Sequence, residues 1–464
     1  MTLVWVWAGV WAGGLIHPTQ AAMTQVLPQG RYKLGVIFAR TGEIRDTYDD
    51  DGNPVSLVAP YQLELSSRNF RRAEPRVSEL VNFLNNLPYQ YDAGNRGTDN
   101  GIRSTTPGSG LPSLGDALSR GSLGVDAYGQ REQWVFQFRR GITERFSLGI
   151  FVQVIQQSLT LKTQIGGINT ANDIYQYFSG IGGTGQLGQF ADGLGLLAQI
   201  NTGTFQSVLE SKGYDRFSDR LETGLGDLII GGRYQWNNRR LAPGHFMAAF
   251  EGRLMLPTGK LARPSQLTGL DFGSGAVSVM AGHNVSLRLD GRWQDHATSW
   301  LPLVGKSAHN ILERIEVYHN ISITQNFPYE RIRRIRANEG DFLPDASTEE
   351  AVTVALGNSW SNTVGASYQI NPTLSFTAQL DWMFRNKDQI LTAGPDTSRA
   401  EYLAQGTDGD LKTLQLQIAA SSIGSFMRGG WPIPGELSFT WSQPLAGRNQ
   451  ILAPYGLAEL ALYF

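Results

Sequence analysis

Charged side chains in this sequence recur at every second position of otherwise apolar runs. In residues 225–236, Leu228, Tyr234 and Trp236 share one parity, whereas Asp227 and Arg233 have the other. Because successive side chains of a β-strand point to opposite faces, such a run separates its charges from its apolar residues. The candidates for a charged, inward face are Arg31, Lys33, Arg139, Asp227, Arg233, Glu251, Arg253, Arg288, Asp290, Arg292, Glu316, Asp381, Arg385 and Glu459.

These candidates comprise eight cationic and six anionic side chains, so the two signs nearly balance. A ring of one sign would select ions by their charge. We therefore expect no strong selectivity for one kind of ion, and an interior that is wet or salt-bridged. Charges that pair with one another and brace the wall are favoured over a dedicated track for a substrate.

Residues suited to catalysis or metal binding are sparse. Cys is absent, which excludes disulfides and thiolate metal sites. The six His residues show no spacing such as HExxH. A hydrolase would need a Ser/His pair, and His319 with Ser322 is a weak candidate because parity places His319 on the apolar face. We predict no catalytic residues, no metal and no cofactor, and the net charge of −2 offers no basic face for nucleic acid.

The elements that must position these side chains are long alternating strands. The mean hydropathy is −0.22, and the mature chain has no apolar run of 18 or more residues that could span a membrane as a helix. A barrel that alternates apolar and polar residues averages to such a value. Alternating runs recur from residue 31 to residue 464. They predict an all-β fold, a closed antiparallel transmembrane β-barrel of about 12–14 strands.

Both ends of the sequence support export to a membrane. Residues 3–16 are apolar and are followed by the small residues Thr19 and Ala21, which predicts a signal peptide of residues 1–22 before a barrel of residues 23–464. No Lys or Arg precedes the apolar run, so either the start lies upstream of Met1 or the signal is atypical.

The last strand carries a second export signal. Its residues Leu460, Leu462 and Phe464 share an apolar face opposite Glu459. This pattern resembles the C-terminal recognition strand of bacterial outer-membrane proteins, which implies that the barrel assembly machinery reads Phe464.

Connections between the predicted strands fall into two classes. Short ones are expected at 141–145, 237–244, about 283–285 and 371–372, and long ones at 41–122, 163–222, 258–273, 387–410 and 444–454. Membrane barrels have short periplasmic turns and longer outer loops, so the long connections are assigned to the outer side. Residues 326–363 fit either class, and the strand number therefore stays open.

The two longest outer loops, 41–122 and 163–222, are richer in apolar residues than a solvated loop requires. In the first, Leu80, Val81 and Leu84 predict a short amphipathic helix, and the second continues its apolar run to residue 200. One interpretation is that these loops fold over or into the barrel mouth as a lid or constriction. The alternative is that they pack on each other or mediate an oligomer contact.

Three segments carry a family resemblance: TGLGDLIIGGRY at 223–234, RLMLPTGK at 253–260 and GITERFSLG at 141–149. Together they resemble the outer-membrane porin-like barrels named for a meta-pathway phenol degradation protein. The resemblance covers roughly residues 125–464 and excludes the loops 41–122 and 163–222. It implies uptake of small, often aromatic or apolar compounds.

These observations favour a passive outer-membrane channel or transporter for small molecules, without enzymatic activity. The expected partners are outer-membrane lipid, the barrel assembly machinery and a small-molecule solute, and the oligomeric state stays open. A fatty-acid-type transporter would need a plugging N-terminal segment before the first strand. Only about eight residues separate the predicted cleavage site from Gly30, which argues against this alternative. A structural barrel that sheathes or anchors a partner, such as an electron-transfer conduit, would need a wide lumen and a companion polypeptide.

Overall fold

The computed structural model describes residues 24–58, 62–69, 75–180, 184–241, 244–267, 269–289, 314–336, 344–392 and 398–464. The predicted signal peptide, residues 1–22, lies outside the described residues, as do the candidates Asp290 and Arg292. Within the described ranges, no helix is long and apolar enough to cross a membrane.

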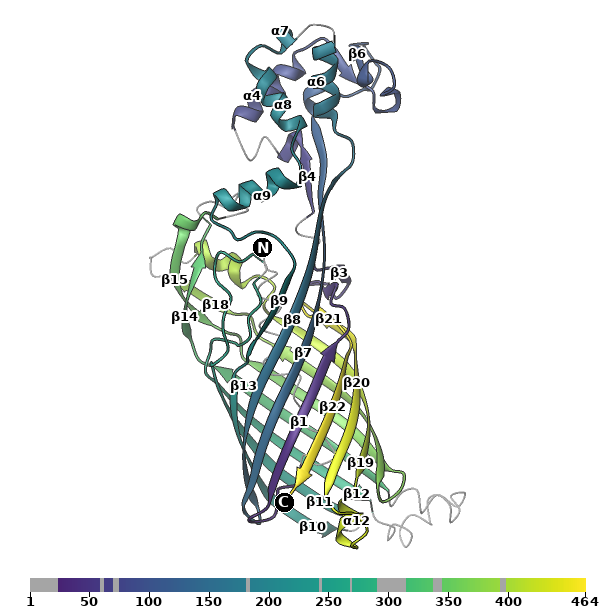
Figure 1. Cartoon of the computed structure of the whole chain (residues 1–464), viewed down its shortest axis with the longest axis vertical. Helices are drawn as coiled ribbons and strands as arrows, with labels where there is room; N and C mark the ends of the chain where they lie inside the picture. The colour runs from purple at the N-terminus through teal and green to yellow at the C-terminus, as the bar shows by residue number, and fades with distance from the viewer. Residues whose placement is uncertain are drawn as a thin grey trace.

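Twelve antiparallel strands form a closed ring (Figure 1). In ring order the strands are β7 (Ser119–Thr143), β1 (Tyr32–Thr41), β22 (Tyr455–Tyr463), β20 (Gly435–Arg448), β19 (Gly409–Ser421), β17 (Leu374–Arg385), β16 (Ser359–Gln369), β13 (Ile315–Asn326), β12 (Ser278–Leu289), β11 (Gly244–Leu256), β10 (Leu228–Leu241) and β8 (Phe146–Gly166). The ring closes because β7 and β8 pair along almost their whole length, from Ser122 with Gly166 to Thr143 with Phe146. The predicted fold class is confirmed, at the lower end of the expected strand number.

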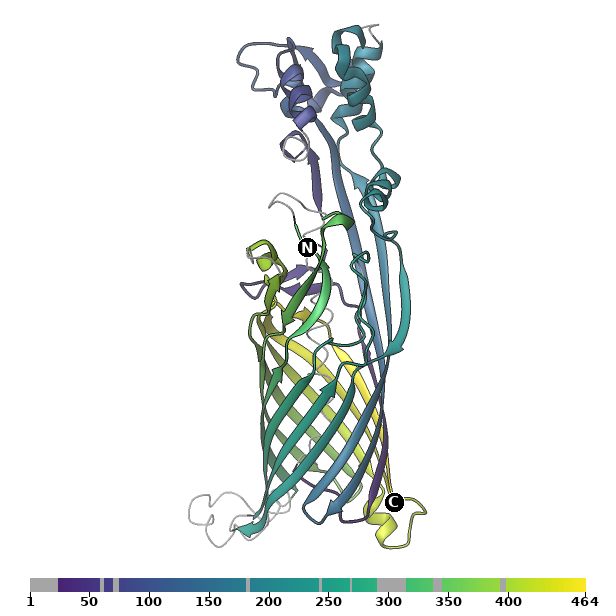
Figure 2. The same ribbon diagram turned by 90° about the vertical axis from the view of Figure 1, so that its left-hand side faces the viewer.

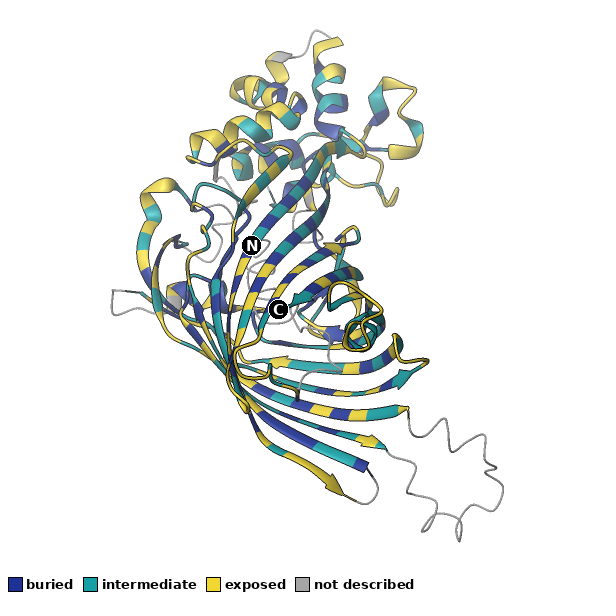
Figure 3. Ribbon diagram, turned by 60° about the horizontal axis from the view of Figure 1, so that its bottom comes forward, coloured by how far each residue is buried: buried dark blue, intermediate teal, exposed yellow. Residues whose placement is uncertain are grey.

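The strands carry apolar side chains on the outer face and mainly polar ones inside. On neighbouring β1 and β22, Val36 pairs with Leu460 and Ile37 with Glu459. Val36 and Leu460 are 38% and 49% exposed, whereas Glu459 is 3% exposed. The same alternation runs along the other strands of the ring as bands of exposed and buried residues (Figure 3). An outer face of this kind needs lipid rather than water around it, so the ring is built to span a membrane.

The two ends of the ring differ. At the turn end lie the short connections between β7 and β8, between β10 and β11 and between β16 and β17, together with the start of β1 and the end of β22. The loop end carries every long excursion that includes further strands. In the segment 326–363, which sequence reasoning left open, residues 359–363 belong to β16. The described residues 327–336 and 344–358 lie at the loop end, where β14 (Tyr329–Arg334), β15 (Glu349–Ala355) and β18 (Gln389–Thr392) form a small sheet.

Several predicted connections were misplaced. The turn expected at about 283–285 is wrong, because β12 continues unbroken from Ser278 to Leu289. The strand β10 reaches Leu241, so residues 237–241, which were expected to open the turn, belong to the strand. The strand β20 reaches Arg448, which shortens the connection expected at 444–454. In each case hydrogen bonds to a neighbouring strand extend the element through residues that do not alternate cleanly.

The strands β7 and β8 are much longer than the rest of the ring. They have 25 and 21 residues, and at about 3.4 Å per residue β7 extends for about 85 Å. Their outer parts form a ribbon that projects beyond the loop end (Figures 1 and 2). Two short strands pair with this ribbon, β4 (Leu63–Ser66) with β7 and β9 (Arg220–Leu225) with β8.

The ribbon ends in a small domain, here called the head, which contains the described residues of 75–118, 167–180 and 184–198 (Figures 1 and 2). Its elements are α4 (Pro75–Asn85), β5 (Tyr89–Tyr91), η3 (Ala93–Asn95), η4 (Asp99–Gly101), β6 (Ile102–Ser104), α5 (Leu114–Ala117), α6 (Thr170–Gly180), α7 (Thr184–Leu187), η5 (Gly188–Phe190) and α8 (Ala191–Ala198). Both long loops contribute to one core, in which Leu84, Ile174 and Phe178 are fully buried. The short helices expected in these loops are confirmed.

The helices of the head do not cover the barrel mouth. The expectation of a lid is wrong for residues 75–118 and 167–198, because their apolar side chains pack on one another at the tip of the ribbon. The return limb of the second loop, with α9 (Thr202–Ser211), does lie near the loop end of the ring. There Arg334 of β14 donates hydrogen bonds to the carbonyls of Lys212 and Gly213 at 2.9 and 2.7 Å.

The remaining short elements lie at the ends of the ring. At the loop end, β2 (Asp46–Tyr48), β3 (Pro54–Ser56) and β21 (Ile451–Leu452) form a three-stranded sheet. Two 3-10 helices, η7 (Ala346–Thr348) and η8 (Ser398–Ala404), belong to the connections on that side. At the turn end, α12 (Ile423–Met427) lies between β19 and β20.

Candidate functional site: the barrel interior

The first cluster of charges inside the ring joins the two ends of the barrel sequence. Lys33 of β1 and Glu459 of β22 form an ion pair at 3.0 Å, and both side chains are buried. Gln137 of β7 donates a second hydrogen bond to the same carboxylate at 2.7 Å. These contacts tie three adjacent strands together on the inward face.

A second cluster lies on β10 and β11. The carboxylate of Glu251 accepts from Arg233 at 2.8 Å and also pairs with Arg253. Nearby, the guanidinium of Arg139 lies over the ring of Phe151, 5.1 Å from its centroid. One carboxylate shared by two guanidiniums braces β10 against β11, but it leaves this part of the wall with a net positive charge.

The other candidates are placed less uniformly. Asp381 accepts hydrogen bonds from Thr363 and Gln379. Arg385 pairs with Asp388 at the loop end of β17, at 2.7 Å. Near the turn end, Arg288 donates to Gln369 at 2.9 Å.

Two further candidates lie close to the turn end. Glu316 is half-buried on β13. Arg31 precedes β1 and is exposed, so the structure does not bring it into the buried set.

Asp227 has a structural setting that sequence reasoning did not foresee. It lies between β9 and β10, and its carboxylate accepts from the amide of Gly259 at 3.0 Å and from the amide and hydroxyl of Ser274 at 2.7 and 2.9 Å. Thr258 accepts from the amide of Leu228 at 3.0 Å. The GLGD and LPTG segments therefore meet in space and anchor the connection between β11 and β12.

The chain before β1 enters the ring. Thr24 is 1% exposed, its hydroxyl lies 3.0 Å from that of Ser286, and its carbonyl accepts from Gln235 at 2.9 Å. Arg233 reaches the carbonyl of Gln25 at 3.4 Å. The inference that so short a segment argues against an N-terminal plug is wrong, because the chain turns back at 28–31 and needs only a few residues to reach the interior.

A cavity of about 240 Å³ opens beside this segment at the turn end of the ring. Gln25, Arg288, Glu316, Glu436 and Glu459 are among the residues that line it. The cavity therefore brings together three of the predicted inward charges with residues from the segment that enters the ring. Its lining is polar and carries both signs of charge.

An apolar layer lies next to the charged clusters and was missed from the sequence. Its buried residues are Ile37, Val135, Phe151, Ile229, Met255 and Leu457. On β1, β7 and β11 it lies nearer the loop end than Lys33, Arg139 and Arg253. Their parity could have revealed this layer, because these residues occupy inward positions of their strands. The predicted interior contained only the charged residues at such positions.

A second apolar cluster, here called the mouth cluster, packs on the inward face of the ribbon at the loop end. Its members are Ile44, Leu57, Val58, Val125, Ala127, Leu159, Leu270, Ile451 and Ala453. It joins three separate connections to β7 and β8. Beside it, Arg331 of β14 makes a two-pronged ion pair with Asp271 at 3.0 and 2.9 Å, and both side chains are buried. Burial by itself would lower the pKa of Arg331, but the close negative charge of Asp271 and the hydrogen bonds to it outweigh burial, so the pKa is raised.

Catalytic and metal-binding geometry is not assembled in the part of the chain that the structure describes. No group of three or more metal-ligating residues occurs there. His319 lies on the outer face, 2.8 Å from Asn362, whereas Ser322 is buried and pairs with Ser361. The two residues of the weak hydrolase candidate therefore point to opposite faces of β13.

No family model matches the chain, and no curated protein matches it. Among solved structures, it is similar to the COG4313 outer membrane channel from Pseudomonas putida F1, with 10% identity over 97% of this chain and 100% of that chain and a TM-score of 0.48. A Pseudomonas aeruginosa FadL homologue has 10% identity over 100% and 98% of the two chains and a TM-score of 0.30.

The P. putida toluene transporter TodX has 9% identity over 98% of this chain and 97% of that chain, with a TM-score of 0.31. Because these scores are below 0.5, the likenesses carry no argument about function. The family resemblance drawn from the residues stays a prediction.

Proposed function

We propose that the chain is a passive outer-membrane channel for small molecules, with aromatic or apolar compounds as its solutes. The observation that carries this proposal is the composition of the interior of a ring built to span a membrane. Paired charges occupy the turn-end side, and the apolar layer with Phe151 and Met255 lies beside them. A solute with an apolar body and one polar group finds complementary surface for both parts.

Both ends of the proposed passage are narrowed by the chain itself. The segment at Thr24 and Gln25 obstructs the turn end, and the mouth cluster narrows the loop end. The cationic and anionic candidates of the inward face nearly balance in number, which leaves little overall field to favour one sign of ion. We therefore infer a channel of low conductance and weak ion selectivity whose opening requires the N-terminal segment to shift.

The rival function, a barrel that sheathes a companion protein, is less well supported. A companion would need an open lumen, whereas the turn-end side is crossed by hydrogen bonds from Gln235 and Arg233 to the entering segment. Assembly by the barrel assembly machinery through Leu460, Leu462 and Phe464 belongs to the same proposal. It is supported by the outward position of Leu460 and Phe464, which are 49% and 54% exposed.

The proposal is tested by liposome swelling with sugars, amino acids and aromatic acids, and by single-channel recording in planar bilayers. Deletion of residues 24–28 should raise conductance severalfold, because it removes the obstruction without breaking the ring. A deletion of equal size in the head, residues 106–110, is the matched control, since this stretch is exposed. It should leave conductance unchanged.

Two results would contradict the proposal. One is the lack of swelling with every solute for both the intact protein and the 24–28 deletion. The other is copurification of a stoichiometric companion polypeptide without measurable conductance, which would favour the sheathing function.

A further inference from the structure

The head contains a cleft of about 810 Å³ that neither the barrel nor its proposed transport accounts for. One wall is α4, from the first long loop, and the other is η5 and α8, from the second. The start of α9 completes the rim at Asn201 and Thr204. The two loops that line the cleft come together at the tip of the ribbon, as the ribbon diagram of the backbone shows (Figure 2).

The cleft is lined by apolar side chains and by a few side chains with amide groups. Leu80, Phe190 and Leu197 are buried or half-buried lining residues, and Leu196 projects with 71% of its surface exposed. Gln189 and Gln199 supply neutral donors and acceptors, whereas the side chain of Asn201 caps α9. Glu79 is the one titratable residue of the lining. Apolar walls with a few neutral polar groups are typical of sites for small uncharged ligands.

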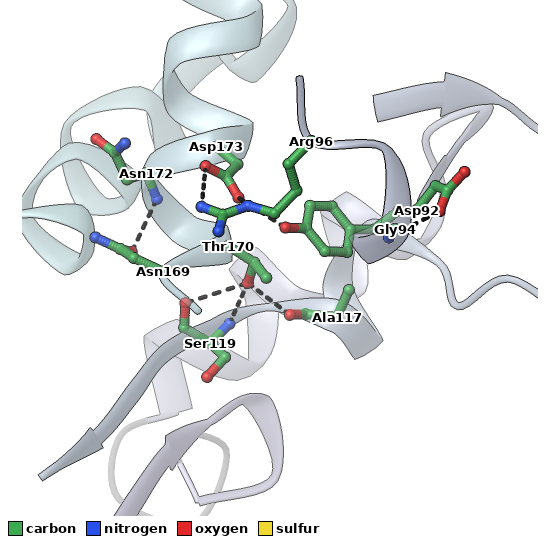
Figure 4. A network of polar contacts seen from close by, with 10 residues as sticks. Asp92, Gly94, Arg96, Ala117, Ser119, Asn169, Thr170, Asn172 and Asp173 are labelled. Carbon is green, nitrogen blue, oxygen red and sulfur yellow. Dashed lines mark hydrogen bonds and ion pairs between the residues drawn. The ribbon is translucent and has the colours of Figure 1, made fainter. Parts of the chain in front are cut away.

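A cluster of polar contacts, here called the latch, joins the two loops that supply the walls of the cleft. The carboxylate of Asp173 on α6 accepts from Arg96 at 2.8 and 3.0 Å and from the hydroxyl of Tyr91 at 2.7 Å (Figure 4). Tyr91 and Arg96 come from the first loop, whereas Asp173 comes from the second. Burial raises the pKa of Tyr91, so its hydroxyl stays protonated and keeps donating.

Closely packed helices connect the latch to the walls of the cleft. On α8, a Cβ added at Gly195 would lie 3.1 Å from the Tyr175 ring of α6. On the other side, Phe83 of α4 packs against Phe190, with ring centroids 4.9 Å apart. These packed contacts set the positions of the two walls, as a preformed ligand site requires.

We infer that this cleft binds a small, uncharged aromatic molecule that carries a hydrogen-bonding group, such as a phenol. The aromatic body would lie against Phe190, Leu196 and Leu197, and its polar group would face the amides of the rim. A volume of about 810 Å³ lies within the roughly 300–1,000 Å³ range of small-ligand sites. The biological role of this binding rests on the proposed function, because a ligand site in the head would concentrate solute above the channel. Binding itself can be tested without transport.

The test uses the full-length protein in lipid nanodiscs and the neutral photoprobe 4-hydroxybenzophenone. After irradiation, crosslinked residues are mapped by mass spectrometry, with and without excess 4-benzylphenol as competitor. The expected result is competitor-sensitive labelling within residues 75–85 and 189–201. Because the barrel also meets the probe through lipid, labelling of outward barrel residues should be insensitive to the competitor.

Two variants and a matched control decide the outcome. Leu196→Glu places a charge in the cleft and should lower head labelling about tenfold, which corresponds to about 1.4 kcal/mol of binding free energy. Val208→Glu on α9 is the control, because Val208 is exposed and is not among the lining residues; it should leave labelling unchanged. Asp173→Asn weakens the latch and should lower labelling of both walls without altering the lining.

Equal labelling of the head in Leu196→Glu and Val208→Glu would overturn the inference, as would labelling confined to the barrel. Conductance of the same preparations, measured in planar bilayers, separates this failure from failure of the proposed channel. A conducting protein with no competitor-sensitive labelling in the head refutes the cleft alone. An intact protein that does not conduct, but whose head shows competitor-sensitive labelling, refutes the channel alone.

Discussion

The barrel wall and the head bury their apolar side chains in opposite directions. In the wall, Val364 and Phe439 face outward with 46% and 58% of their surface exposed, while Ser442 is fully buried inside. In the head, Phe178 and Leu84 are fully buried. The hydrophobic effect removes apolar surface from water. The direction in which each region buries its apolar side chains therefore indicates that lipid surrounds the wall and that water surrounds the head.

The comparison also concerns cooperativity. The ring is a continuous hydrogen-bonded sheet with ion pairs between strands that are distant in sequence. The head is a separate apolar core at the end of a two-stranded ribbon. We therefore expect the head to unfold without the ring, and the ring to keep its closure when the head is damaged.

Truncation of the head core should have the largest effect. Phe178→Ala removes a fully buried ring, which typically costs about 3–5 kcal/mol. Limited proteolysis of the reconstituted protein should then cut within residues 75–118 and 167–198. Resistance of the barrel to detergent denaturation on unheated gels should be unchanged. Unfolding of the head and the ring at one denaturant concentration would show that they form one cooperative unit, and would contradict the expectation that they unfold separately.

A matched pair of substitutions should separate the two solvents. Val364 on β16 and Val208 on α9 are 46% and 44% exposed, so exposure alone treats them alike. Val364→Arg should destabilise the barrel by about 2–4 kcal/mol, because it places a charge on the lipid face near mid-strand. Val208→Arg should change stability by less than about 0.5 kcal/mol. Urea unfolding in lipid vesicles measures both, and equal effects would contradict a lipid-facing wall.

The smallest expected effect concerns the rim of the barrel, where hydrogen bonds rather than apolar burial hold a connection. Thr258→Val removes the acceptor for the Leu228 amide and the donor to Gly226, and should lower the free energy of unfolding by about 1 kcal/mol. Thr98→Val in the head is the control, because the Thr98 side chain makes no capping hydrogen bond. A midpoint that is unshifted for Thr258→Val would remove the structural role assigned to the LPTG segment.

Sequence reasoning was strongest where the pattern is local. The alternation that places Leu462 outward and Glu459 inward is a property of one strand and needs no knowledge of its neighbours. It failed where strand ends depend on partners, as in β12, whose middle was taken for a turn. The ribbon shows the same limit, because β7 continues far beyond the ring through its pairing with β8.

The candidate site divides in the same way. Inward parity selected Lys33, Glu251 and Glu459 from the sequence, but it could not say which charges would pair. The apolar layer at Ile37 and Phe151 had the same parity and was passed over because only charges were sought. The entry of Thr24 into the ring could not be read from a segment that lacks periodicity.

The sequence by itself determined a closed, lipid-facing β-barrel, because side-chain parity along each strand is set by backbone geometry that neighbouring residues share. Only the tertiary structure decided which residues meet across long separations: Lys33 with Glu459, Asp227 with Ser274 and Tyr91 with Asp173. These contacts form the braced interior, the anchored rim and the latched head. They join segments that are far apart in the sequence, and a local pattern of residues does not record which distant segment a side chain will meet.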